Sequence, residues 1–506
     1  MTVGSGGRGL GAVASRGAAV TLGAQGIRIL VQLGGIVLLA RLLSPADYGL
    51  TTMVIAIIGV GEILRDFGLS SAAIQAKTLS VGQRSNLFWI NTGIGALLTG
   101  IVAALAVPIA AFYDDDRLIA VTLALSATFL LNGISTQFRA DLNRRFRFGA
   151  LASVEISAQA VGLGIALILA VAGFGYWALV AQQVIQVLFQ VLILPFVARW
   201  MPGLPRRGEE MRSFFTFGGP LVASQVLVYA SRNVDALVIG RVFGASSLGF
   251  YNRAFQLMSL PLNQINAPSS RVALPTLSRL RDEPARYREF LTFGQITLLN
   301  IVSLVLALCV AQAAPIIAIS LGSQWAPSVP LFQILAVAGL FQAASFATYW
   351  VVLSLGRTKR QFWYTLITRP LVIGLIIGGA LWGVEGVAWA YALGNALLWP
   401  MGIVWLVRGS IAPAGRLFVG ALRTIVVYAL AAAASYASTM AIPESLSIVR
   451  ILVGAAVLLA ALAIIALVFP PFRRDVRAMA GARRFFQRQR SARTAPPSTE
   501  PQEADL

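Results

Sequence analysis

Residues 448–470 read IVRILVGAAVLLAALAIIALVFP, a run in which Arg450 is the only charged side chain. A helix that crosses a membrane needs about 20 mostly apolar residues, and this run meets that length. The whole chain shares the bias, since 57% of its 506 residues are hydrophobic, 12% are charged and the mean hydropathy is +0.77. Soluble domains average about 25% charged residues. The composition therefore excludes a soluble enzyme and predicts an all-α, polytopic membrane protein.

A window of the same length, moved along the chain, predicts about 14 transmembrane helices. They lie near residues 20–42, 49–71, 87–112, 118–138, 150–172, 176–198, 213–240, 248–273, 291–321, 329–355, 361–382, 386–407, 417–441 and 448–470. The first run exceeds the about 7–15 residues of a signal-peptide core and has no small-residue cleavage site, so we expect no cleavable signal peptide.

The distribution of positive charge predicts the orientation of these helices. The net charge is +20, and all but two of the 40 basic residues are Arg. If both termini are cytoplasmic, the inner segments hold 29 Lys and Arg, and the outer segments hold Arg41, Arg117, Arg241 and Arg450. Cytoplasmic loops are enriched in Lys and Arg. We therefore expect an even number of helices, cytoplasmic termini and no nucleic-acid partner.

Residue types that the chain lacks exclude several kinds of chemistry. There is no His, and the single Cys309 lies in an apolar run, so it can form no internal disulfide. No Gly-rich P-loop motif occurs. We expect no metal, no cofactor and no enzymatic activity. Residues 473–506 begin as a basic segment, which we interpret as a surface helix on anionic lipid or simply as a topogenic flank, and end as a disordered tail.

The chain contains an internal repeat. LARLLSPADYGL (39–50) matches VIGRVFGASSLGF (238–250) at a spacing of 200 residues, which aligns Arg41 with Arg241 and Gly49 with Gly249. GFGYWALV (173–180) and GVEGVAWA (383–390) follow in the same order. The repeat predicts two parallel six-helix bundles, residues 1–205 and 206–410, around a central cleft, as in transporters. Residues 411–472 would add a further helix pair, before the cytoplasmic tail 473–506.

The repeat motifs also carry a family resemblance. ARLLSPADYGLTTMV (40–54), RNVDALVIGRVFGASSLGFYNRAFQL (232–257) and PTLSRL (275–280) resemble the Wzx-type polysaccharide flippases, in the lipopolysaccharide and teichuronic acid exporter branch of the multidrug/oligosaccharidyl-lipid/polysaccharide exporter superfamily. The resemblance covers roughly residues 15–470. The residues that we expect to serve as structural motif positions are Arg41, Pro45, Gly49, Arg241 and Gly249.

This resemblance implies a function and a location. It implies that the protein moves an undecaprenyl-pyrophosphate-linked oligosaccharide from the inner to the outer leaflet of a bacterial cytoplasmic membrane by alternating access. The purpose would be the synthesis of lipopolysaccharide, capsule or exopolysaccharide. The expected partners are the lipid-linked oligosaccharide and membrane lipids, with a polysaccharide polymerase and export proteins as further candidates.

Charged residues inside the predicted spans are the candidates for substrate binding. An ionisable group near the bilayer centre costs about 2.5–3.5 kcal/mol on insertion scales, so it normally faces a cavity or a partner. The candidate residues are Gln25, Arg28, Gln32, Arg232, Arg253, Arg271 and Arg369. Our most specific hypothesis is that Arg28 and Arg232 both bind the pyrophosphate of the lipid-linked substrate, because one guanidinium can donate two hydrogen bonds to phosphate oxygens. The alternatives are pairing with nearby acids and, for the last three, a place near the membrane interface.

Acidic residues beside these arginines have two open interpretations. They could carry a coupling cation, or they could form structural pairs such as Glu62 with Arg65 and Asp235 with Arg232. The residues in this group are Glu62, Arg65, Asp66, Glu155 and Asp235.

Three rival functions remain open at this stage. A multidrug exporter of the same superfamily would need embedded acids for cationic drugs, whereas most embedded charges here are Arg. A polyprenyl-linked glycan transferase or polymerase would need sizeable outer loops, and the predicted outer loops are short. A scaffold for a polysaccharide-synthesis complex is the third.

Overall fold

The computed structural model describes residues 6–66, 79–209, 211, 225–226 and 228–481, with the backbone alone for residues 6–22, 24 and 66. These residues form helices, and no strand occurs among them. Twelve helical segments are long and apolar enough to cross a membrane. Two of them, Val234–Arg279 and Thr358–Val407, have 46 and 50 residues. Many membrane-spanning helices are therefore present, and the number 14 stays a prediction.

Contacts divide the chain into two compact units. Unit 1 comprises Met1–Gln256, Ile316–Phe332 and Arg369–Tyr391, and unit 2 comprises Leu257–Pro315, Gln333–Thr368 and Ala392–Leu506. The division cuts through several helices rather than falling between two sets of six. The repeat boundaries near residues 205 and 410 therefore stay a prediction, and each unit is described separately below.

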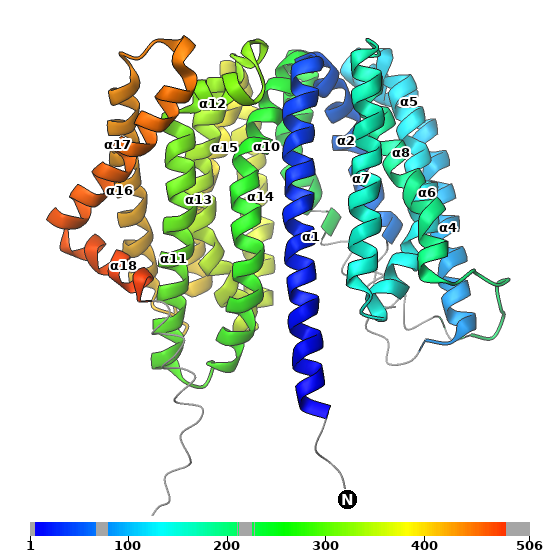
Figure 1. Cartoon of the computed structure of the whole chain (residues 1–506), viewed down its shortest axis with the longest axis horizontal. Helices are drawn as coiled ribbons and strands as arrows, with labels where there is room; N and C mark the ends of the chain where they lie inside the picture. The colour runs from blue at the N-terminus through cyan, green and yellow to red at the C-terminus, as the bar shows by residue number, and fades with distance from the viewer. Residues whose placement is uncertain (1–5, 67–78, 210, 212–224, 227, 482–506) are drawn as a thin grey trace, which may run out of the picture. The chain divides into compact units, whose positions relative to one another are not determined.

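Seven helices make up most of unit 1. They are α1 (Gly6–Leu42), α2 (Pro45–Asp66), α4 (Val81–Ala104), α5 (Ala106–Tyr113), α6 (Arg117–Arg144), α7 (Phe148–Val171) and α8 (Trp177–Ala198). α6 packs against both α4 and α8, and α7 packs against α8 and α1 (Figure 1). The aromatic rings of Phe88, Phe138 and Trp200 contact one another edge-on or tilted in a buried cluster of this bundle. The apolar spans thus bury against each other as their composition predicts.

Local sequence signals explain where α4 starts. Ser80 accepts a hydrogen bond from the Gln83 backbone N–H, and the Gln83 side chain accepts one from the Ser80 backbone. This reciprocal capping box satisfies two of the N–H groups that a helix start leaves open.

The two copies of the repeat motif cross each other inside unit 1. A Cβ on Gly49 of α2 would lie 1.8 Å from the carbonyl oxygen of Ala245, and a Cβ on Gly249 would lie 1.9 Å from that of Pro45. The 200-residue spacing aligns Pro45 with Ala245 just as it aligns the two glycines. The contact is therefore reciprocal, and each glycine is required because only a hydrogen fits against the opposing backbone.

Helix α10 (Val234–Arg279) changes direction close to this crossing. Gly244 has a φ of 78° and a ψ of −179°, which breaks the helical geometry in the middle of the second motif copy. A positive φ combined with a ψ near 180° is essentially restricted to glycine. The break separates a short segment carrying Asp235 and Arg241 from the longer segment that carries Arg253.

The end of α1 is capped by residues from far along the chain. In η1 (Ser323–Trp325), Gln324 and Trp325 both donate to the carbonyl oxygen of Ala40, at 2.6 and 2.8 Å. Arg41 donates to the carbonyl of Ile319, in α12 (Ala313–Ser320). The last carbonyls of a helix lack intrahelical partners, and these side chains satisfy them.

Unit 2 contains the second part of α10 and the C-terminal helices. The further elements of the chain are α11 (Pro284–Ala311), α13 (Ser328–Ser354), α14 (Thr358–Gly379), η2 (Ala380–Trp382), α15 (Gly383–Gly402), η3 (Ile403–Val407), α16 (Ala414–Thr439), η4 (Glu444–Leu446), α17 (Ser447–Val468) and α18 (Pro470–Ala480). The division into units falls within α12, α13, α14 and α15.

The predicted additional helix pair corresponds to α16 and α17. Both pack on α11, and the short α18 folds back against them (Figure 1). Phe472 of α18 is buried in a cluster with Tyr428 and Leu458. Asp475, also on α18, forms a 2.6 Å ion pair with Arg423 of α16. The start of the basic tail is thus a docked helix, whereas the interpretation of residues 482–506 falls outside the described residues.

Candidate substrate site

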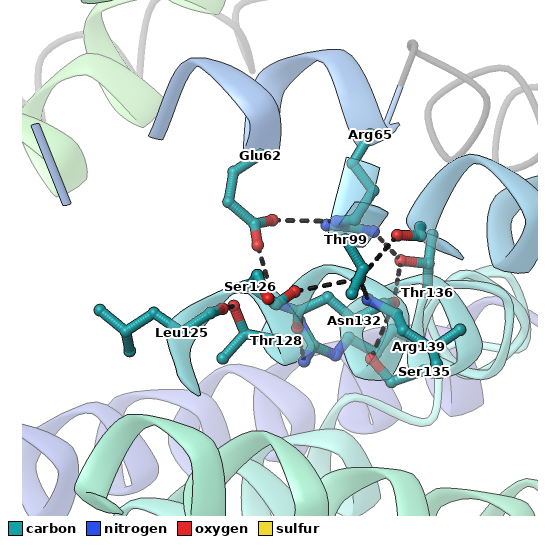
Figure 2. A network of polar contacts seen from close by, with 12 residues as sticks. Glu62, Arg65, Thr99, Leu125, Ser126, Thr128, Asn132, Ser135, Thr136 and Arg139 are labelled. Carbon is teal, nitrogen blue, oxygen red and sulfur yellow. Dashed lines mark hydrogen bonds and ion pairs between the residues drawn. The ribbon is translucent and has the colours of Figure 1, made fainter. Parts of the chain in front are cut away.

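A network of polar side chains lies between α2, α6 and α8 of unit 1. Glu62 accepts from Arg65 Nε at 2.9 Å and from Asn132 Nδ2 at 3.0 Å. Arg65, only 9% exposed, also donates to the Thr136 hydroxyl. Figure 2 shows these side chains of α2 reaching toward those of α6. Glu62 and Arg65 therefore form an ion pair that also fastens α2 to α6.

Arg139 brings a further cation into this network. Its guanidinium donates to Asn132 Oδ1 at 3.5 Å and to Gln190 Oε1 of α8. Its Nε is buried and makes no hydrogen bond with the described residues, and none of their carboxylates forms an ion pair with it. Arg139 is thus a positive charge held by neutral amides, which leaves it available to an anion.

Arg28 of α1 adds a third guanidinium near this network. It pairs loosely with Glu155 of α7, at 3.5 Å, and keeps 54% of its side chain exposed. Glu155, Arg65 and Glu62 all act electrostatically on Arg139. We call these five residues, Arg28, Glu62, Arg65, Arg139 and Glu155, the charge cluster. It contains three cations and two acids, so it carries a net positive charge.

A separate cavity in unit 1 contains Arg253. The cavity has a volume of about 140 Å³ and is lined by residues that include Gln32, Gln159, Gln182, Gln256 and Tyr48. The Arg253 guanidinium lies 3.5 Å from the centroid of the Tyr48 ring, a cation–π contact. Arg253 and Gln32 were predicted to bind substrate, and the structure brings both to this cavity.

Two further predicted site residues, Arg232 and Asp235, have separate surroundings. Arg232 is exposed and forms no ion pair with Asp235. Asp235 is 5% exposed and instead accepts from the Tyr251 hydroxyl at 2.8 Å and from the Ala236 N–H at 2.9 Å. The hypothesis that Arg28 and Arg232 share one anion therefore gains no direct geometric support, because their side chains have different surroundings.

The remaining predicted residues are spread along three helices. Gln25 of α1 and Arg271 of α10 are exposed, and Arg369 of α14 is half-buried. Arg241 is exposed, near the crossing of the motif copies. The prediction for the Asp66 side chain falls outside the described part of the chain.

Two residues of these sites were missed at the sequence level. Arg139 fell just outside the predicted span 118–138, but α6 continues to Arg144. Tyr48 stood out only as part of a motif. A signal that could have found Arg139 is its seven-residue spacing from Asn132, which places both on one face of α6.

Two acids outside the membrane-spanning helices are paired with arginines. At the start of α6, Asp115 accepts two hydrogen bonds from the Arg117 side chain, at 2.9 and 2.7 Å, and this holds the pKa of the Asp115 carboxyl below its ordinary value. In α18, burial raises the pKa of Asp475, while Arg423 acts in the opposite direction. Among the residues that the structure describes, no group of three or more His, Cys, Asp or Glu lies together.

Comparison with known proteins assigns the chain to a family. The model of a family described as "Polysaccharide biosynthesis protein" matches residues 38–330, more than half of the chain and both copies of the repeat motif. The chain belongs to this family. The matched segment contains the glycine crossing, Arg139 and Arg253.

Individual relatives agree with the family assignment. The chain is 29% identical over 339 residues to the teichuronic acid biosynthesis protein TuaB of Bacillus subtilis (strain 168), covering 66% of this chain and 69% of TuaB. It is 25% identical to the lipopolysaccharide biosynthesis protein WzxC of Escherichia coli (strain K12), covering 70% and 73%. It is 24% identical to the succinoglycan biosynthesis transport protein ExoT of Rhizobium meliloti (strain 1021), covering 73% and 75%.

Solved structures show the fold of this family member. The lipid II flippase MurJ in an inward closed conformation superposes with a TM-score of 0.69 at 15% identity, covering 88% of this chain and 98% of MurJ. An inward-facing multidrug resistance MATE family transporter gives a TM-score of 0.58 at 14% identity, covering 78% and 95%. The all-α transporter fold predicted from the sequence is therefore confirmed.

Proposed function

We propose that this protein moves a polyprenyl-pyrophosphate-linked oligosaccharide from the inner to the outer leaflet of a bacterial cytoplasmic membrane by alternating access. The family assignment and the relatives in polysaccharide biosynthesis and transport support the substrate class. The single observation that carries the proposal within this chain is Arg139, a cation inside a membrane-spanning helix that forms no ion pair with any carboxylate the structure describes.

The charge cluster is the proposed binding place for the pyrophosphate. Three guanidinium groups, on α1, α2 and α6, can supply paired hydrogen bonds to phosphate oxygens. The Arg28–Glu155 pair is loose and exposed, so Arg28 can exchange its carboxylate for a phosphate at small cost. A headgroup anion that must leave water is stabilised by such fixed positive charge.

The proposed orientation places both termini in the cytoplasm. The 29-to-4 distribution of Lys and Arg supports it. In this orientation the reciprocal crossing of Gly49 and Gly249 lies near the outer surface, and it would have to separate for the substrate to leave outward. Transport is then a conformational process without a chemical step. Anionic membrane lipids and a polysaccharide polymerase are further proposed partners.

A multidrug exporter is the main rival, since the fold is shared with a MATE transporter. The net positive charge of the cluster disfavours it, because an organic cation would be repelled by the unpaired Arg139.

Loss of the gene tests the proposal directly. We expect complete lipid-linked repeat units to accumulate on the inner leaflet, where they are protected from reagents added outside the cell. Accumulation of truncated glycans would instead identify a transferase, and an unchanged lipid-linked pool with altered drug tolerance would identify a drug exporter.

A further inference from the structure

The Arg253 cavity differs in chemistry from the charge cluster. None of the five cluster residues lines it, and its polar lining comes from four helices: Gln32 of α1, Gln159 of α7, Gln182 of α8 and Gln256 of α10, beside Tyr48 and Arg253. The remaining lining is aliphatic. A cavity of about 140 Å³ with four primary amides and one guanidinium is a second polar site, lined by other residues than the charge cluster.

Arg253 is buried there without a counter-charge. It is 8% exposed, its Nη1 donates to Gln256 Oε1, and it forms no ion pair with any described carboxylate. Its Nε is buried and makes no hydrogen bond within the described part of the chain, and neither does the Tyr48 hydroxyl. A buried guanidinium is costly when it is unpaired. A ligand with a hydrogen-bond acceptor and a negative charge would therefore satisfy both the Arg253 guanidinium and the Tyr48 hydroxyl.

The charge of the residues that line the cavity indicates the charge of its ligand. Arg253 is the one cation among the residues that line the cavity, so a singly charged anion would give a neutral site. A pyrophosphate carries more than one negative charge, so it would leave uncompensated negative charge in this cavity, where the dielectric constant is low. The charge cluster also has a net charge of +1, but its three guanidinium groups offer more hydrogen-bond donors to phosphate oxygens than Arg253 alone does.

The four glutamine side chains indicate which chemical groups the rest of the ligand carries. A glutamine amide both donates and accepts hydrogen bonds, as a sugar hydroxyl does. Four glutamines around one guanidinium thus match a sugar ring that bears one carboxylate, and the guanidinium fork matches the two carboxylate oxygens.

We propose that the Arg253 cavity binds a carboxylate-bearing sugar of the transported oligosaccharide, and so makes the protein selective for acidic glycans. This proposal rests on the proposed function, and it names the substrate class that the function leaves open. Arg253 pairs with the carboxylate, Tyr48 and the glutamines bind the ring, and the pyrophosphate stays at the charge cluster.

Binding of small probes to the purified full-length protein tests the proposal. Sodium D-glucuronate, D-glucose and inorganic pyrophosphate are titrated separately and followed by calorimetry. We expect D-glucuronate to bind at least tenfold more tightly than D-glucose. Arg253→Gln should abolish this preference and leave pyrophosphate binding unchanged. Arg279→Gln, an exposed position at the end of the same helix, is the matched control and should behave as the unchanged protein.

A second variant separates a loss of ligand binding from misfolding of the Arg253→Gln protein. Gln256→Glu places a carboxylate at the existing hydrogen-bond partner of Arg253, where it competes with the ligand. We expect this variant to unfold at the same or a higher temperature and to bind D-glucuronate at least tenfold more weakly. Intact D-glucuronate binding in a folded Gln256→Glu protein contradicts the proposal.

The remaining outcomes separate this inference from the proposed function. If Arg253→Gln weakens pyrophosphate binding and not D-glucuronate binding, Arg253 belongs to the pyrophosphate site and the inference is wrong. If neither changes, the Arg253–Tyr48 contact is purely structural and the inference is also wrong. If glycan flipping occurs but acidic and neutral glycans are moved equally, the inference fails and the flippase stands. Selective D-glucuronate binding without flipping would refute the flippase alone.

Discussion

Arg139 is the residue on which the transport proposal depends most. Arg139→Gln should lower glycan export about ten- to a hundredfold, because a hydrogen bond to a charged group contributes about 1.5–3 kcal/mol. Membrane abundance should stay near normal, since Arg139 leaves no acid unpaired behind it. Arg139→Lys should restore export in part, because lysine keeps the charge and lacks the fork. Quantifying exported glycan against protein abundance, with Arg279→Gln as control, checks this.

A result of normal export by an abundant Arg139→Gln protein would remove Arg139 from the binding site. Arg28, whose side chain is exposed, would then be the candidate for binding the pyrophosphate without Arg139.

Residue roles could be predicted from the sequence only in part. Embedded charge marked Arg28, Glu62, Arg65 and Arg253 as candidates, because a membrane makes any such residue conspicuous. Which of them meet depends on tertiary packing, which a spacing rule cannot provide. Arg139 was missed because the predicted span ended at residue 138, whereas α6 continues to Arg144.

At the scale of elements, the glycine crossing should tolerate no side chain. Gly49→Ala and Gly249→Ala each force a methyl group against a carbonyl oxygen, so each should destabilise the protein by about 1–3 kcal/mol, the usual cost of overpacking. Gly100→Ala on α4 is the matched control, because nothing lies within 4 Å of its Cβ position. Thermal unfolding in detergent measures the difference. Equal unfolding temperatures for Gly49→Ala and Gly100→Ala would contradict the reciprocal contact.

The docking of α18 gives a second test at this scale. Replacing one member of the Arg423–Asp475 pair leaves a charge with reduced exposure unpaired, which costs up to about 3–5 kcal/mol when a pair is fully buried. Asp475→Asn should therefore expose α18 to protease. The double change Arg423→Met, Asp475→Leu should restore protection, because burial raises the pKa of Asp475 even beside Arg423, and apolar side chains carry no such desolvation cost. Protection of Asp475→Asn equal to that of the unchanged protein would contradict this role.

Helix positions were the most predictable part of the fold. The predicted spans 150–172 and 176–198 match α7 (Phe148–Val171) and α8 (Trp177–Ala198) within two residues, because hydrophobic length is a local property. The repeat motif was also recognisable as sequence. Its reciprocal backbone contact could not be predicted, since it joins residues 200 positions apart through packing alone.

At the scale of the whole molecule, alternating access requires the crossing in unit 1 to open. A Cβ on Gly240 would lie 3.2 Å from Met53 Cγ and 2.9 Å from Tyr113 Cε1, so a cysteine at position 240 would contact residue 53 once the Tyr113 ring shifts. In a Cys309→Ser background, oxidation of Met53→Cys, Gly240→Cys should stop transport, and a reductant should restore it. Each single cysteine variant is the control. Full transport by the oxidised, crosslinked protein would show that this contact need not open.

The central claim, that the protein flips a lipid-linked glycan, is tested most directly in proteoliposomes that contain only this protein and a labelled polyprenyl-pyrophosphate oligosaccharide. A glycan-cleaving enzyme added outside reports how much of the label becomes accessible with time. We predict that glycan initially protected on the inner leaflet becomes accessible with the intact protein, and about ten- to a hundredfold more slowly with Arg139→Gln. If the protected fraction decays at the same rate in liposomes without the protein, the account is wrong.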